Sequence, residues 1–193
     1  MAFPIATATL VPADFEMLEG CRRGEAEAFR LLFETYKDRV YSFALRFLGD
    51  ESRAADLTQD VFVKLYDRIA EFRGDARFET WLYRIVANAC IDDQRRRKKW
   101  LPWLNQEPPA HVGRSNSGDD RLVRRETEGA VQQAIGKLSP ALRAPILLRY
   151  VEGLSYEEIG ETLSLSPGTV ASRLSRAHRL LARKLEKFKG MAV

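Results

Sequence analysis

Polar and basic side chains recur between residues 169 and 179, at a spacing that would let them contact the bases and phosphates of DNA from one helix. They are Thr169, Ser172, Arg173, Arg176 and Arg179. Arginine can donate two hydrogen bonds to a guanine edge in the major groove, and hydroxyl groups can reach phosphates or bases. These residue types therefore indicate recognition of duplex DNA. The alternative is a helical hairpin whose basic face is simply solvated.

Two short helices must present these side chains. Ser155 and Glu158 form a capping-box pattern before a predicted helix over 156–163. Pro167 suits the first position of a second predicted helix over 167–188, where its missing N–H costs nothing. A three-residue turn joins the two helices. The pattern predicts a helix-turn-helix, a motif that places its second helix in the major groove.

Basic residues gather in two places of a chain whose formal net charge is only +4. Residues 167–193 carry seven Arg or Lys against one acid, and residues 95–99 are five consecutive basic residues. Localised positive charge of this kind suits a polyanionic partner. A basic run by itself is also typical of a solvated or disordered segment. It indicates nucleic-acid binding only together with other features of the neighbouring sequence.

A second candidate nucleic-acid site lies between Phe72 and Arg97, where aromatic side chains alternate with arginines. Unpaired bases stack on flat rings while cations hold the backbone, so this composition suits single-stranded DNA. The alternative is that Phe78 and Trp81 belong to the core, because Leu82 and Ile85 continue the apolar stripe.

A polar face follows the predicted helix over 52–72. Its side chains lie opposite an apolar stripe and are Asp56, Gln59, Asp60 and Lys64. Spacing alone favours an ordinary solvated helix face.

Helical periodicity dominates the chain, and no segment alternates as a β-strand does. We predict an all-α protein with an N-terminal helical domain over 14–99 and a C-terminal helix-turn-helix domain over 120–190. The flexible linker between them, 100–119, contains three prolines and two glycines. Because it has too few periodic apolar residues to pack, we expect the two domains to move independently. Trp100 and Trp103 are expected to fold back onto the N-terminal helices.

The sequence lacks the patterns of a catalytic or metal site. Cys21 and Cys90 match neither a disulfide framework nor metal-ligand spacing, and Cys90 is expected to be a core thiol. There is no phosphate-binding glycine loop, no run of ~20 apolar residues and no signal-peptide pattern. We expect a non-enzymatic protein of the reducing cytoplasm, with no cofactor, no metal, no small-molecule substrate and no membrane insertion.

Four stretches together resemble the sigma-70 family of sigma factors, in its minimal two-domain extracytoplasmic-function (ECF) group. They are residues 28–50, 56–66, 72–97 and 138–181. The resemblance implies a bacterial initiation factor that binds core RNA polymerase, recognises promoter DNA and opens it. It also implies an anti-sigma factor as a partner.

The resemblance implies a role for particular residues in each stretch. The helix that docks on polymerase would carry Asp56, Gln59, Asp60 and Phe62. The loop and helix that take up the −10 element would carry Phe72, Arg73, Thr80, Arg84, Asn88, Arg95, Arg96 and Arg97. The helix that reads the −35 element would carry Thr169, Ser172, Arg173, Arg176 and Arg179. Two positions depart from the family: Ala171 stands where a basic residue is common, and Ser164 where the turn often has glycine.

Two other classes of protein remain as alternatives. A stand-alone helix-turn-helix regulator would need a ligand pocket or dimer interface in its N-terminal domain rather than an aromatic and basic loop. A pure interaction scaffold would leave both basic patches unexplained. Co-purification with core polymerase would separate either alternative from a sigma factor.

Overall fold

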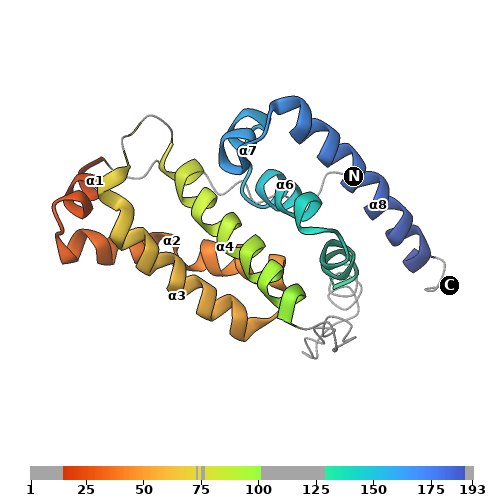
Figure 1. The fold of residues 1–193 in the computed structure, drawn as a ribbon, viewed down its shortest axis with the longest axis horizontal. Helices are drawn as coiled ribbons and strands as arrows, with labels where there is room; N and C mark the ends of the chain where they lie inside the picture. The colour runs from red at the N-terminus through yellow and green to blue at the C-terminus, as the bar shows by residue number, and fades with distance from the viewer. Residues whose placement is uncertain (1–14, 73, 75–76, 101–128, 190–193) are drawn as a thin grey trace, which may run out of the picture.

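The structure is a computed structural model that describes residues 15–72, 74, 77–100 and 129–189, except for the side chains of 98–100 and 187–189. The labelled helices are α1 (Phe15–Arg22), α2 (Ala26–Leu48), α3 (Glu51–Arg68), α4 (Phe78–Trp100), α6 (Pro140–Tyr150), α7 (Tyr156–Leu163) and α8 (Pro167–Lys189) (Figure 1). Residues 129–136 are also helical. These residues contain no strand, which confirms the predicted all-α fold and its two helical regions.

The N-terminal bundle, α1 to α4, is organised by the hairpin of α2 and α3. Gly49 ends α2 with a left-handed φ of 69°, a conformation that glycine adopts without steric cost. Asp50 then caps α3, because its carboxylate accepts a hydrogen bond of 3.0 Å from the backbone N–H of Arg53. The two helices therefore run back along each other, and α4 packs against both of them.

The C-terminal bundle, α6 to α8, contains the predicted helix-turn-helix. Ser155 and Glu158 form the expected capping box at the start of α7, with hydrogen bonds of 3.1 and 2.7 Å. The hydroxyl of Ser166 accepts a bond of 3.2 Å from the backbone N–H of Thr169 and so caps α8. Ser164 makes the turn with a left-handed φ of 55°. These local predictions are confirmed.

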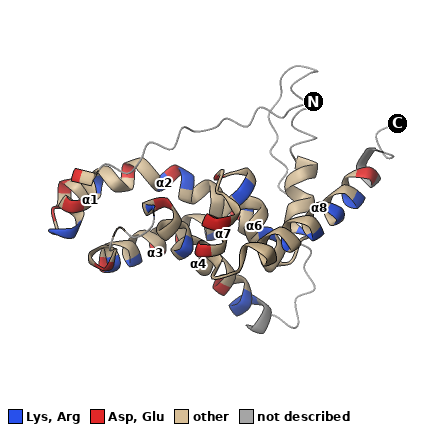
Figure 2. Ribbon diagram, turned by 90° about the horizontal axis from the view of Figure 1, so that it is seen from above, with Lys and Arg blue, Asp and Glu red and all other residues tan. Residues whose placement is uncertain are grey.

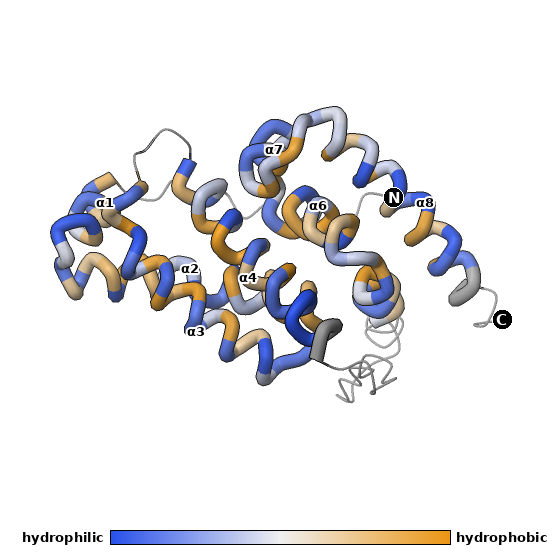
Figure 3. The backbone as a smooth tube through the Cα atoms, in the orientation of Figure 1, coloured by the Kyte–Doolittle hydropathy of each residue, from blue (hydrophilic) through white to orange (hydrophobic). Residues whose placement is uncertain are grey.

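Helix α6 joins the two bundles. It is buried from Leu142 to Leu148, and Figure 3 shows hydrophobic residues along much of its length. It contacts α2 and α4 on one side and α7 and α8 on the other, while α7 lies along α4. Buried apolar residues of both bundles form one continuous core.

This packing differs from the expectation of independently moving domains. That expectation came from the composition of the linker, but the contacts are made by the helices that flank it. Several predictions concern residues outside the described part: Asp14 at the start of the N-terminal domain, residues 101–119 of the linker, the side chains of Trp100 and Trp103, and residues 120–128 at the start of the C-terminal domain. Helix α6 ends at Tyr150, and Gly153 beyond it has a left-handed φ of 73°.

Candidate nucleic-acid and polymerase interfaces

Helix α8 carries the basic residues that the sequence singled out, and Figure 2 shows Lys and Arg in blue at several places along its ribbon. Ser172, Arg176 and Arg179 are exposed, and Thr169 and Arg173 are half-buried. Within the described part of the chain, the guanidinium groups of Arg173, Arg176 and Arg179 form no hydrogen bond or ion pair. Their donors therefore remain available. Val170 and Leu174 point the opposite way into the core, which fixes the orientation of the helix.

The aromatic loop before α4 is packed rather than open. Phe72, Phe78 and Trp81 form a cluster with ring centroids 5.4 to 6.0 Å apart. Phe72 is 8% exposed and Thr80 is 2% exposed, so neither side chain presents a surface to DNA in this arrangement. In this arrangement the three rings shield one another from water. Arg73 lies outside the described residues.

The helix that follows presents a polar stripe. Asn88 is exposed and makes no hydrogen bond with the described residues, and Arg95 to Arg97 are exposed as well. Arg84 is already occupied, because its Nη2 donates a bond of 2.5 Å to the carbonyl oxygen of Glu161 in α7. Arg77, which the sequence analysis did not single out, is likewise 3.2 Å from the Glu158 carboxylate.

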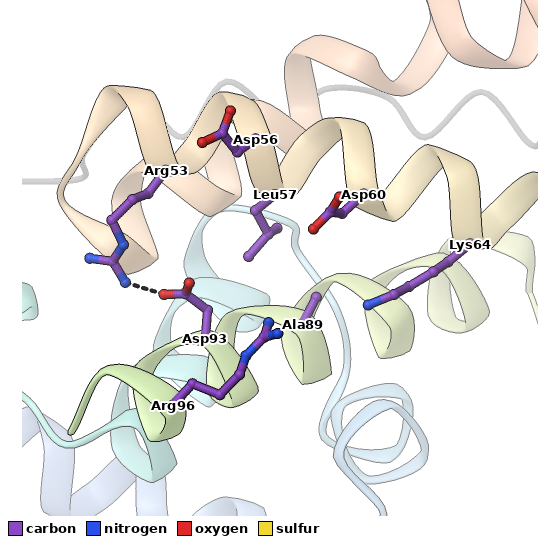
Figure 4. Close-up of a pocket in the computed structure, with 8 residues that line it drawn as sticks. All are labelled: Arg53, Asp56, Leu57, Asp60, Lys64, Ala89, Asp93 and Arg96. Carbon is purple, nitrogen blue, oxygen red and sulfur yellow. Dashed lines mark hydrogen bonds and ion pairs between the residues drawn. The ribbon is translucent and has the colours of Figure 1, made fainter. Parts of the chain in front are cut away.

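A small groove of about 90 Å³ runs between α3 and α4 (Figure 4). Asp56 and Asp60 line it from α3 and form no ion pair or hydrogen bond with the described residues. Lys64 and Arg96 stand at its rim, and the short side chain of Ala89 leaves the space open.

The residues around the groove are held by packing and by one ion pair. Arg53 of α3 pairs with Asp93 of α4 at one end of the groove. Gln59 is exposed, but Phe62 is only 4% exposed and packs edge-on against Phe33, with ring centroids 4.7 Å apart. Phe62 therefore packs on the inner side of α3 and does not reach its surface.

Sequence reasoning missed two buried charged side chains, Glu152 and Arg143. The Glu152 carboxylate accepts a hydrogen bond of 3.0 Å from Arg39 and another from the hydroxyl of Tyr83. Burial raises the pKa of Glu152 in spite of these bonds. Arg143 stacks on the ring of Phe47 at 5.2 Å, and burial lowers its pKa to about 10.

The described residues offer no group of three or more His, Cys, Asp or Glu that could hold a metal ion. None of the described helices is both long and apolar enough to cross a membrane.

Comparison with known proteins decides the family. Residues 32–100 match Sigma-70 region 2, and residues 128–181 match Sigma-70, region 4. The RNA polymerase sigma-H factor of Pseudomonas aeruginosa is 34% identical over 183 residues, which are 90% of this chain and 94% of that protein. The chain belongs to the sigma-70 family of RNA polymerase sigma factors.

Further relatives assign this sigma factor to the ECF group. The ECF sigma factor SigW of Bacillus subtilis is 34% identical over 173 residues, which are 85% of this chain and 92% of SigW. A solved structure of CnrH in complex with the cytosolic domain of CnrY is similar, with a TM-score of 0.68 and 26% identity. The match covers 91% of this chain and 98% of that chain. This sigma factor therefore directs RNA polymerase to promoters and is not an enzyme, as predicted.

Proposed function

We propose that this sigma factor docks on core RNA polymerase through the groove between α3 and α4, with Asp56, Gln59 and Asp60 as its contacts. The observation that carries this proposal is the pair of carboxylates, Asp56 and Asp60, that face the groove without a partner among the described residues. Unpaired carboxylates at a groove suit basic or amide donors of a protein partner.

The two DNA-binding roles are divided between the bundles. The exposed stripe of α4 would bind the opened −10 element, with Arg84, Asn88 and the basic side chains of Arg95, Arg96 and Arg97. Phe72 and Thr80 would shape the loop from inside, and Arg73 would add a charge. The outer face of α8 would read the −35 element through Thr169, Ser172, Arg173, Arg176 and Arg179. Free guanidinium donors on an exposed helix support this assignment.

A protein inhibitor completes the proposed function. CnrH, which this chain resembles over most of its length, was solved in complex with the cytosolic domain of CnrY. The resemblance to ECF sigma factors implies an anti-sigma factor, and together with this complex it leads us to propose that an anti-sigma factor binds this chain. Core polymerase and promoter DNA would place its activity in the cytoplasm.

The docking proposal is tested by replacing Asp56 and Gln59 with alanine in one variant. Both side chains are exposed, so circular dichroism should stay unchanged while the affinity for core polymerase falls about tenfold or more. Asp67→Ala is the matched control, because it removes an exposed carboxylate from the same helix outside the groove. Unchanged affinity of the double variant in a titration would refute the docking site.

The two DNA roles are separated by a second pair of variants. Arg176→Ala should weaken binding of the holoenzyme to −35 duplex by about 1–3 kcal/mol if the arginine pairs with guanine. Asn88→Ala should spare duplex binding and impair promoter opening. Normal permanganate reactivity of the −10 region with the Asn88→Ala variant would contradict the assignment to α4.

A further inference from the structure

A tyrosine of α6 and a histidine of α8 contact each other on the surface of the C-terminal bundle. The hydroxyl of Tyr150 lies 2.8 Å from Nε2 of His178, and the two rings meet edge to face with centroids 5.5 Å apart. Tyr150 is 47% exposed, and His178 is exposed as well. The two contacts together fix the position and orientation of the imidazole on the outside of α8.

His178 extends the surface of α8 that is proposed to read the −35 element. Arg179 of that surface is the next residue, and the exposed Ser175 lies one turn before His178. At a rise of about 1.5 Å per residue, His178 is roughly 16 Å along the helix from Pro167. The N-terminal residues of a recognition helix contact base edges, whereas most other polar contacts go to phosphates. A short imidazole this far along α8 therefore has phosphates within its reach rather than bases.

Within the described part of the chain, no carboxylate forms a hydrogen bond or ion pair with His178. α6 and α7 pack against α8. The titratable side chains of these two helices are Arg143, Arg149, Tyr150, Tyr156, Glu157, Glu158 and Glu161. Glu158 is bonded to the backbone N–H of Ser155, and Glu152 in the loop before α7 is bonded to the N-terminal bundle. The helical residues 129–136 contain no titratable side chain.

The charged neighbours of His178 are cations. Arg179 adjoins it on α8, where the residues three and four positions away on either side are uncharged. Arg149, next to Tyr150 on α6, stacks on Tyr156 at 5.4 Å and donates a bond of 2.9 Å to the carbonyl of Leu154. A positive charge on His178 is therefore not neutralised within the described residues and would attract a phosphate.

The hydrogen bond with Tyr150 can persist in both charge states of His178. A neutral imidazole has one nitrogen that donates and one that accepts, so the tyrosine hydroxyl donates to Nε2 and Nδ1 carries the proton. In a protonated imidazole both nitrogens donate, so Nε2 donates to the tyrosine oxygen and the hydroxyl proton can turn to another acceptor. Protonation thus adds a positive charge and frees one donor while the ring stays in place.

We propose that His178, held by Tyr150, is a proton-dependent phosphate contact that strengthens binding of the −35 duplex at acidic pH. Histidine is the side chain that ordinarily changes charge between about pH 5 and 8. Arginine stays charged throughout that range, so Arg176 and Arg179 supply a constant affinity to which the charge of His178 is added. This inference rests on the −35 role proposed for α8.

The contact is tested by measuring the affinity of the holoenzyme for a −35 duplex at about pH 6 and pH 8, over a series of salt concentrations. Each phosphate contact adds about 0.9 to the slope of log K against log salt concentration. With the unaltered protein, the slope at the lower pH should be steeper by about 0.9 and the affinity higher by about threefold. His178→Gln keeps a hydrogen-bonding side chain but cannot ionise, so both differences should disappear. An equal pH response of the two holoenzymes would come from polymerase itself and would overturn the inference.

Two further variants separate the charge from the orientation of the ring. His178→Lys carries its charge at both pH values, so at about pH 8 it should bind the duplex within about twofold of the affinity of the unaltered protein at about pH 6. Tyr150→Phe keeps the ring contact but removes the hydroxyl, and it should reduce the slope difference to about half. All these side chains are exposed, so circular dichroism should stay unchanged. A full pH response of Tyr150→Phe would overturn the positioning role of Tyr150.

Arg176→Ala distinguishes failure of this inference from failure of the −35 role of α8. It should weaken duplex binding at both pH values and leave the pH response in place, because arginine does not titrate in this range. If Arg176→Ala binds the duplex as tightly as the unaltered protein, the −35 proposal fails and the contact of His178 falls with it. If Arg176→Ala weakens binding but His178→Gln retains the pH response, the inference about His178 fails alone.

Discussion

Replacing Ser164 with glycine should stabilise this sigma factor. Ser164 holds a left-handed φ of 55° in the turn between α7 and α8, is exposed, and forms no side-chain hydrogen bond with the described residues. A left-handed conformation costs a residue with a Cβ roughly 1–2 kcal/mol. Glycine avoids that cost but loses about 0.5–1 kcal/mol more backbone entropy on folding. The net gain should be about 0.5–1 kcal/mol.

Thermal and urea unfolding of the two proteins measure this gain. For a chain of this size, the expected change raises the melting temperature by about 1–4 °C. Ser175→Gly provides a control of opposite sign, because Ser175 is equally exposed but lies within α8, where glycine should cost about 0.5 kcal/mol. Destabilisation by Ser164→Gly, or the same sign at both serines, would refute the assignment of strain to this turn.

Three further substitutions test the packing. Gly160→Ala places a Cβ 2.7 Å from a backbone carbonyl oxygen of the turn and should cost about 1–3 kcal/mol in thermal unfolding, whereas Gly168→Ala, with open space around it, should not. Arg143→Met removes the donor to four backbone carbonyls, including that of Phe47, and should cost roughly 3 kcal/mol in urea titrations. Burial raises the pKa of Glu152, so the protonated carboxyl stabilises the folded chain at low pH. This stabilisation is lost as the pH rises through the raised pKa. Glu152→Gln cannot ionise, so its stability relative to the unaltered protein should increase from about pH 4 to pH 7 in the same titrations.

Local features of the C-terminal bundle were predictable from the sequence. The capping box at Ser155, the start of α8 at Pro167 and the inward stripe of Val170 and Leu174 depend on residues a few positions apart. Helical spacing and caps determine such features without reference to the rest of the chain. The bounds of α7 were predicted to the residue for this reason.

Burial at the candidate sites was less predictable. Phe62 and Phe72 lie in stretches whose family role is contact with a partner, yet both pack inward. One signal was available for Phe62: it follows Val61 and precedes Leu65 by three positions, so a wider apolar stripe would have included it. For Phe72, the clustering of rings could be read equally as a stacking surface or as a core.

The alignment of the two bundles could not have been predicted from the sequence. Glu152 meets Arg39 and Tyr83, which lie 113 and 69 positions away, and no spacing rule connects them. Nothing in the sequence around a single acidic residue that follows an apolar helix indicates which residues it will pair with. The composition of the linker also gives no information about whether the helices on either side of it pack together.

The continuous core that α6 builds across both bundles has a consequence for how the protein unfolds. Two bundles with separate cores could melt one after the other, whereas residues of one shared core lose their packing together. Heating should therefore give a single transition in which the calorimetric and van't Hoff enthalpies agree. A substitution in the C-terminal bundle, such as Gly160→Ala, should lower the melting temperature of α2 and α3 by the same amount as that of α7 and α8.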